Sequence, residues 1–496
     1  MGEIVTRPVV LIDHRPYNPS ERKEDGLGSH IAPLKTADLP PRTRSFWQLA
    51  GPGAVLVGLS IGAGELVMWP WITAKFGASM VWAAALGVFL QLWVNLEIGR
   101  WTIVTGEAPY TGFARVWMGF IYILLFLTFA GLFLPGWARV SGAALKGLIF
   151  GPDGPGADWM WTGLTFVLIA ATLFGPKVMY QAMERIVIGM VVFITLGLIF
   201  VAFQVGTIEH VAEMARGLVN FGHIELTEDF PFSRFFGAVV FAGAGGAGNL
   251  WYAFYLRDKN IGMGARMPRL QNPLRGGSNE EEATGYLYPE TEANQRAFKN
   301  WFRWIRLDQC LFFWGLNSFT MFLFMFGVLC VLRPSGVVPA EGRIIWDMSL
   351  ILENSMGAAG FYLFLAIGMA TLFSTQLVSV DGNARVWSYI IRTSFPFGAK
   401  IDQAKLYIPF AVLFMVAGTV STWFFERFAV TGLGFLFNAA LLSGLTMALY
   451  VPLMLYMNLR TLPPSARPGL VSIVMMLIAS VVYGGFALYS LWITIF

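Results

Sequence analysis

The sequence predicts an all-α integral membrane protein with about eleven transmembrane helices. Charged side chains make up 13% of the 496 residues, about half of the ~25% usual in a soluble domain, whereas hydrophobic residues make up 56%. Eleven apolar stretches are long enough for a helix to cross ~30 Å of hydrocarbon, which takes about 17–25 residues. This composition argues against a soluble enzyme, a nucleic-acid-binding protein and a disordered scaffold.

The expected spans follow one another along most of the chain. They are the stretches 50–74, 79–104, 117–137, 159–175, 185–204, 235–256, 308–332, 357–381, 405–424, 429–457 and 470–496. An interruption at Pro135 marks the end of the third, and the fourth is short. The sizeable polar parts are the tail 1–46 and the loop 257–306, and this loop is expected to be helical near Glu290–Arg303.

The distribution of basic residues predicts the orientation. With the tail 1–46 in the cytoplasm, the inward-facing segments carry 25 Lys and Arg residues and the outward-facing segments carry 8. Cytoplasmic loops are enriched in Lys and Arg in membrane proteins. We therefore expect a multi-pass protein of the cell or inner membrane, with a cytoplasmic N-terminus, a cytoplasmic loop 257–306, an extracytoplasmic loop 205–234 and an extracytoplasmic C-terminus.

Glycine clusters interrupt the first and the sixth expected spans. Gly62-Ala63-Gly64-Glu65-Leu66 in the first aligns with Gly246-Ala247-Gly248-Asn249-Leu250 in the sixth, and four of the five residues are identical. Each glycine costs about 1 kcal/mol relative to alanine within a helix, so such clusters favour unwinding. Because five spans separate the clusters, the second copy must have the opposite topology.

Unwound backbone at membrane depth is tolerated where it lines a cavity or is buried in protein, and paired interruptions point to a transporter site. The alternative is that the glycines only permit close helix packing. Glu65 favours the site, because an ionisable residue within a span is expensive and usually functional.

Several motifs resemble one known family. The stretch from Gly51 to Gly77 resembles the first span of the Nramp divalent-metal transporters, which runs Gly-Pro-Gly, eight residues, Asp-Pro-Gly-Asn and a Lys/Tyr-Gly turn. Further motifs follow in the family's order: Leu90-Gln91 to Arg100, Val104-Thr105-Gly106, Glu184-Arg185-Ile186-Val187-Ile188-Gly189, and Ser374-Thr375-Gln376 to Asp381-Gly382. The resemblance covers the first ten spans.

This resemblance implies a LeuT-type fold, in which two inverted repeats of five helices are followed by one extra helix and work by alternating access. The first repeat would occupy residues 47–204, the second 235–457 and the extra helix 470–496. Helices 1 and 6 are expected to be broken.

The chain departs from the family at the metal site. Gly62-Ala63-Gly64-Glu65 stands in place of Asp-Pro-Gly-Asn, and Gly246-Ala247-Gly248-Asn249 stands in place of Met-Pro-His-Asn. The missing methionine is a soft ligand that would favour transition metals over Mg²⁺ and Ca²⁺. The remaining candidates for substrate binding are Gly62, Ala63, Glu65, Gly243, Gly246, Asn249 and, by resemblance, Gln376. Glu65 and Asn249 are the candidate metal ligands, and such oxygen ligands would suit a hard cation that keeps some water.

Three acidic residues within the spans are candidates for a proton path: Glu65, Asp381 and Glu97. Each has an alternative. Glu65 could be a cation ligand, Asp381 could lie at the membrane interface, and Glu97 could form a structural ion pair with Arg100, three residues away on the same helix face.

The function predicted from these features is secondary transport of a divalent cation through a site with altered ligands, with proton coupling left open. The alternatives are transport of a small, amino-acid-like organic solute on the same fold, and a non-transporting scaffold or sensor. We expect no enzymatic activity, no cofactor and no nucleic-acid partner. The expected partners are the lipid bilayer and a small ion or solute.

Overall fold

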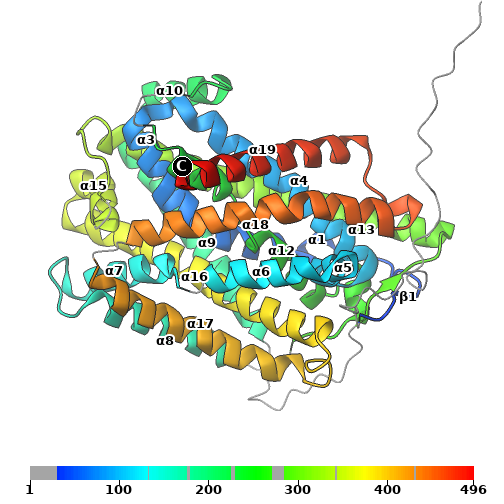
Figure 1. Ribbon diagram of the computed structural model, residues 1–496. Coiled ribbons are helices and arrows are strands. Elements are labelled where there is room, and N and C mark those ends of the chain that lie inside the picture. The colour runs from blue at the N-terminus through cyan, green and yellow to red at the C-terminus, as the bar shows by residue number, and fades with distance from the viewer. Residues whose placement is uncertain are drawn as a thin grey trace, which may run out of the picture.

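The computed structural model describes residues 31–131, 133–175, 179–224, 230–270, 284–340, 343–428 and 432–495, and it is predominantly helical (Figure 1). The α-helices are α1 (Phe46–Leu49), α2 (Pro52–Ser60), α3 (Trp69–Phe76), α4 (Val81–Thr105), α5 (Pro109–Val116), α6 (Met118–Gly131), α7 (Gly136–Phe150), α8 (Asp158–Phe174), α9 (Met179–Val205), α10 (Ile208–Val219), α11 (Phe232–Val240), α12 (Gly248–Asp258), α13 (Glu292–Asp308), α14 (Asn317–Gly327), α15 (Ile344–Met356), α16 (Ala358–Ser394), α17 (Gln403–Glu426), α18 (Gly432–Thr461) and α19 (Leu470–Ile495). Strands β1 (Lys35–Thr36) and β2 (Tyr286–Leu287) form a short parallel pair. Most of the long helices run along one common direction, with α15 and β1 at opposite ends.

Each of the eleven expected stretches coincides with helical structure, so the all-α membrane fold is confirmed. Eight helical stretches of the described residues are long and apolar enough to cross a bilayer, and the longest, Pro52–Thr105, covers the second expected span and all but the first two residues of the first. The number of crossings, the boundaries of the two repeats and the assignment of loops to a membrane side stay predictions. The tail residues 1–30 and the loop residues 271–283, which include three of the glutamates of the loop, lie outside the described residues.

The first span differs from the expectation of an unwound helix. Between α2 and α3 the chain forms a π-helix, η2 (Ile61–Met68), so the helix continues through the glycine cluster. The amide of Trp69 bonds to the carbonyl of Gly64, five residues back, where an α-helix would use the fourth. The glycines are therefore accommodated by widening the helix rather than by opening it.

The sixth span is broken, as expected. Helix α11 ends at Val240 and α12 begins at Gly248, and the residues between them are not helical. Gly245 and Gly246 have φ of 63° and 51°, in the left-handed region that glycine adopts without steric cost. These two residues fix the position of the break.

Some elements were not anticipated. The third span continues past Pro135 into α7, so it is longer than its expected end at residue 137. The seventh span is the end of one helical stretch, Glu292–Leu332, in which α13 leads through the π-helix η6 (Gln309–Leu316) into α14 and ends in the π-helix η7 (Val328–Leu332). The helix expected near Glu290–Arg303 is thus confirmed as α13. Helices α5, α10 and α15 lie in connections between spans.

Burial separates the central helices from those that face lipid. The most apolar part of α16 is 83% buried, whereas the corresponding parts of α9, α17 and α19 are only about a third buried or less. Helix α16 packs against α7, α15, α17, α2 and η2. The apolar side chains on the outer faces of α9, α17 and α19 would be costly to expose to water, so these faces suit a hydrocarbon solvent.

Candidate functional site

Polar side chains from three other helices hold the open backbone of the sixth span. The amide nitrogen of Gln91 on α4 donates to the carbonyl of Val240 (2.7 Å), and its oxygen accepts from the backbone N–H of Gly245 (3.0 Å). The Tyr450 hydroxyl on α18 donates to the carbonyl of Gly246 (3.0 Å). The side-chain amide of Asn317 on α14 donates to the carbonyl of Ala242 (2.8 Å). Unpaired backbone groups are costly when buried, so these contacts stabilise the break.

The first span packs directly against this break. A Cβ at Gly64 would overlap the backbone carbonyl of Phe241, so glycine is required for the two spans to approach so closely. On the opposite side, a Cβ at Gly62 would overlap the hydroxyl of Thr375 on α16. The same hydroxyl lies 3.0 Å from the carbonyl of Leu59. The glycines of the first motif therefore serve close packing at η2.

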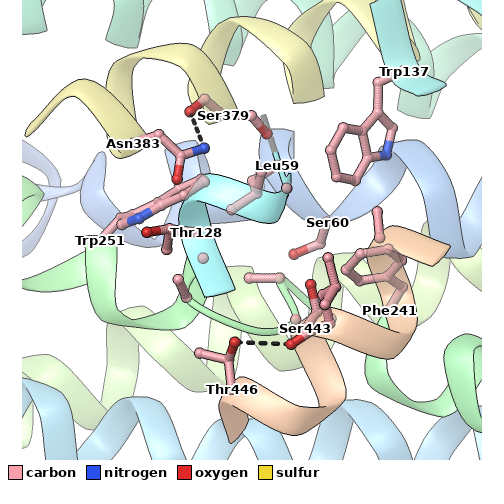
Figure 2. A pocket seen from close by; sticks show the side chains of 18 of the residues that line it. Leu59, Ser60, Thr128, Trp137, Phe241, Trp251, Ser379, Asn383, Ser443 and Thr446 are labelled. Atoms are coloured by element: carbon pink, nitrogen blue, oxygen red, sulfur yellow. Dashed lines mark hydrogen bonds between the residues drawn. The ribbon is translucent and has the colours of Figure 1, made fainter. Parts of the chain in front are cut away.

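A cavity of about 90 Å³ lies between the two interrupted spans and helices α6, α16 and α18. Its polar lining consists of hydroxyl and amide side chains: Ser60, Thr128, Ser379, Asn383, Ser443 and Thr446. Figure 2 shows the rings of Trp137, Phe241 and Trp251 around the same space. The wall is completed by Gly243 and Gly245 in the sixth-span break and by Gly248 at the start of α12. No charged side chain lines the cavity within the described part of the chain.

Glu65 lies on η2 and is completely buried, but it does not line this cavity. Neither carboxylate oxygen has a basic partner or a well-aligned hydrogen bond among the described residues. The nearest donor is the Thr320 hydroxyl on α14, whose single hydrogen is shared between the carboxylate and the helix carbonyls of Leu316 and Asn317, each at 3.1 Å. Leaving a carboxylate buried without a counter-ion is expensive. Glu65 is therefore suited to receive a cation or a proton.

The candidate ligands turn toward different helices. The side-chain amide of Asn249 donates to Gln91 (3.1 Å) and to the Tyr450 hydroxyl (3.4 Å), so it faces α4 and α18, while its oxygen has no partner. The oxygen of Gln376 accepts from the backbone N–H of Ala138 on α7 (3.1 Å). Among the described contacts, these two side chains share no hydrogen-bond partner with Glu65.

The candidate backbone positions are divided between the two spans. Gly62 and Ala63 lie in η2, where the helix is continuous. Gly243 and Gly246 lie in the break, and Gly243 lines the cavity. The two motifs are thus brought together as predicted, but only the second exposes unwound backbone.

The other two acidic candidates already have partners. Glu97 pairs with Arg100 (3.0 Å) and accepts from Asn458 (2.7 Å) and Ser472 (2.9 Å), which joins α4 to α18 and α19. Glu97 and Arg100 thus form the structural ion pair that their three-residue spacing favoured.

Asp381 is also buried and paired. It accepts from Arg385 (2.8 Å) and from the Tyr407 hydroxyl (2.7 Å). It is wholly buried inside the protein, and its position relative to the membrane interface stays a prediction. Of the three candidates for a proton path, Glu65 alone has no basic partner among the described residues.

The arrangement limits the kind of metal site that is possible. Within the described ranges, no group of three or more His, Cys, Asp or Glu side chains is placed to hold a metal ion. A cation at this site would be held by one carboxylate together with neutral oxygens and retained water, which suits a hard cation.

Comparison with solved structures places the fold among transporters. No family model and no curated protein matches the sequence. A mutant of the manganese transporter of Eremococcus coleocola superposes with a TM-score of 0.65 at 12% identity, over 92% of this chain and 89% of that one. The chain has the fold of this transporter. The same transporter in complex with an aromatic bis-isothiourea-substituted compound gives 0.62 at 12% identity, over 93% and 89% of the two chains. The LeuT-type fold expected from the motifs is thereby confirmed.

Of the predicted site residues only Gly243 lines the cavity, and the sequence did not identify the polar side chains of its wall. Ser60, Thr128, Asn383 and Ser443 are isolated polar residues in apolar stretches. Their signal was weak, because serine and threonine commonly bond back to their own helix carbonyls, as Ser60 does to Leu56 (2.8 Å). Only the packing of five helices shows that they share one space.

Proposed function

We propose that the protein is a secondary transporter that moves a divalent metal cation across the membrane by alternating access. The observation that carries the proposal is Glu65, a completely buried carboxylate without a basic partner among the described residues, on the π-helical segment opposite the broken sixth span. A bare charge in such a place is stable only when it is neutralised. A cation that binds and leaves would supply this neutralisation in each transport cycle.

The ligand chemistry supports a hard cation. Neither a thioether nor an imidazole lies among the predicted ligands, so the preference for transition metals that soft ligands confer is reduced. Mg²⁺ and Ca²⁺ accept carboxylate, amide, hydroxyl and water oxygens. We expect no preference for Mn²⁺ over these ions, because the methionine of the family motif that the chain resembles is absent here.

The distribution of basic residues supports the proposed orientation. The tail and the loop 257–306 would face the cytoplasm of a cell or inner membrane, and the C-terminus would face outward. Glu65 is also the acidic candidate that we propose for proton coupling, because Glu97 and Asp381 are held in ion pairs.

Uptake by proteoliposomes tests the proposal. Purified protein is reconstituted, and Mn²⁺, Mg²⁺ and Ca²⁺ are offered separately, with a pH-sensitive dye inside the vesicles. We expect saturable uptake of at least one ion that Glu65→Gln abolishes, whereas Glu292→Gln, at an exposed surface position, leaves it unchanged. Uptake that is equal in wild type and Glu65→Gln would refute the role of Glu65.

The cavity supports a second candidate, transport of a small organic solute. Its lining combines hydroxyl and amide groups with three aromatic rings and no charged side chain, which suits a small uncharged or zwitterionic molecule. At about 90 Å³ it admits only a molecule of a few heavy atoms in this conformation. An amino-acid and organic-acid panel in the same vesicles tests this candidate. Ser443→Leu fills the cavity. If this variant loses solute uptake while Glu65→Gln retains it, the result would favour the organic solute over the divalent cation as the transported substrate.

A further inference from the structure

We infer that the cation site at Glu65 is completed by the seventh span, through Asn317 and Thr320 of α14, rather than by Asn249 and Gln376. This inference rests on the proposed function, since it names further ligands for the same cation. It also separates the cation from the cavity, because neither Glu65 nor these two residues lines that space.

Residues of the first, sixth and seventh spans lie close together around Glu65. Gly64, next to Glu65, touches the backbone at Phe241 and Ala242. The Asn317 side chain reaches the same point, since its amide donates to the carbonyl of Ala242 (2.8 Å). Thr320, three residues further along α14 and on the same helix face, lies beside the Glu65 carboxylate. The first, sixth and seventh spans therefore meet around Glu65.

The hydrogen bonds leave a set of oxygen atoms without donors. The nitrogen of Asn317 must face the Ala242 carbonyl, because a carbonyl accepts only from a donor, and this fixes its oxygen Oδ1 as the free end of the amide. That oxygen is buried and has no partner, and the Glu65 carboxylate has no basic partner among the described residues. The Thr320 hydroxyl shares its one hydrogen between this carboxylate and two helix carbonyls, and its lone pairs stay available in each case. All of these atoms are acceptors, and a cation is the ligand that satisfies acceptors alone.

Asn249 is a weaker partner for Glu65. Its oxygen is also free, but its nitrogen faces Gln91 and Tyr450, on the α4 and α18 side of the break. Gln376 has its oxygen occupied by the backbone N–H of Ala138. In addition, both elements of the inferred site adjoin π-helical turns, η2 at Glu65 and η6 just before Asn317, and such turns occur often at functional sites.

Cation-dependent thermal stability of the purified full-length protein tests the inference without requiring transport. Wild type and variants are titrated with Mg²⁺, Ca²⁺, Mn²⁺ and Na⁺, and an apparent Kd is obtained from the shift in Tm. We expect Asn317→Ala and Thr320→Val to weaken divalent binding by about 10–100-fold, the usual loss when a group around a metal is removed. Asn249→Ala and Gln376→Ala should change it by less than about threefold. Thr172→Val, which removes a partly exposed hydroxyl from α8, is the matched control.

The outcomes separate the inference from the proposed function. Divalent binding that needs Glu65 and Asn249 but not Asn317 or Thr320 would overturn the inference and leave cation transport standing. No stabilisation of wild type by any divalent ion would overturn the proposed function, and stabilisation by Na⁺ alone would overturn the divalent assignment. If Thr320→Val lowers stability without any cation, Thr320→Ser serves instead, and it should bind cations like wild type because it keeps the hydroxyl.

Discussion

Removing the guanidinium of Arg385 should be among the most destabilising single changes in this protein. Arg385 on α16 bridges two buried carboxylates, with 2.6 Å to Asp258 at the end of α12 and 2.8 Å to Asp381 one turn earlier on α16. All three side chains are at most 6% exposed. Arg385→Met would leave two buried negative charges without a counter-ion. Breaking a buried pair costs about 3–5 kcal/mol, which corresponds to a roughly 10²- to 4 × 10³-fold loss in the folding equilibrium.

Equilibrium unfolding in mixed micelles, titrated with a denaturing detergent, measures this loss. The matched control is Arg296→Met, whose pair with Glu292 is largely exposed and therefore contributes about 0–1 kcal/mol. Adding Asp258→Asn and Asp381→Asn to Arg385→Met should recover much of the stability, since all three charges of this buried cluster would then be removed. If Arg385→Met lowers the free energy of unfolding by no more than Arg296→Met does, the inference of an uncompensated buried charge is incorrect.

Three further changes test local features of the fold. Gly62→Ala should cost about 1–3 kcal/mol by overpacking against Thr375, whereas Gly484→Ala on α19, where a Cβ meets no neighbour, should be neutral or gain up to about 1 kcal/mol in the same unfolding titration. Gly245→Ala should cost at least about 1–2 kcal/mol, because its φ of 63° is left-handed, and a loss below 0.5 kcal/mol would contradict a fixed break. Burial raises the pKa of Glu290, but hydrogen bonds, chiefly from the backbone at Ser465, outweigh it and hold the pKa below the ordinary 4.5. The stabilisation by Glu290 should therefore be present above pH 4.5 and vanish as the pH falls through the lowered pKa, and Glu290→Gln should flatten this acid limb of the stability curve.

The helical membrane fold could be predicted from the sequence because its signals are local. An apolar stretch long enough to cross a bilayer leaves its backbone no alternative to a helix. The break in the sixth span could also be predicted, since Gly245 and Gly246 adopt a conformation that other residues rarely take. The resemblance of ordered motifs then predicted the LeuT-type fold, which superposition with a manganese transporter confirms at only 12% identity.

The contacts between spans could not be predicted in the same way. Asn317 and Thr320 lie in an apolar stretch some 250 residues from Glu65, and no local pattern connects them. Likewise, no local pattern reveals that Arg385, one turn after Asp381 on α16, also pairs with Asp258 at the end of α12. The side-chain direction of Asn249 depends on Gln91 and Tyr450, which belong to two other helices.

The two glycine motifs, nearly identical in sequence, take different conformations because their surroundings differ. In the sixth span, Gln91 and Tyr450 supply donors and acceptors to the open backbone, so the break costs little. In the first span, Ser374 and Thr375 of α16 donate to carbonyls at Gly58 and Leu59, and the backbone amides that follow must find partners within their own helix. A π-helix meets this need and still frees carbonyls for α16.

The backbone hydrogen bonds of the first span can therefore change from the π-helical to the α-helical pattern more easily than the break in the sixth span can close. That break is fixed by two left-handed glycines. Because successive residues of an α-helix are separated by about 100°, losing the extra residue of a π turn would rotate Glu65 away from α14. A carboxylate that leaves its ligands in this way would release a bound cation, which connects the conformation of the first span to the transport cycle proposed above.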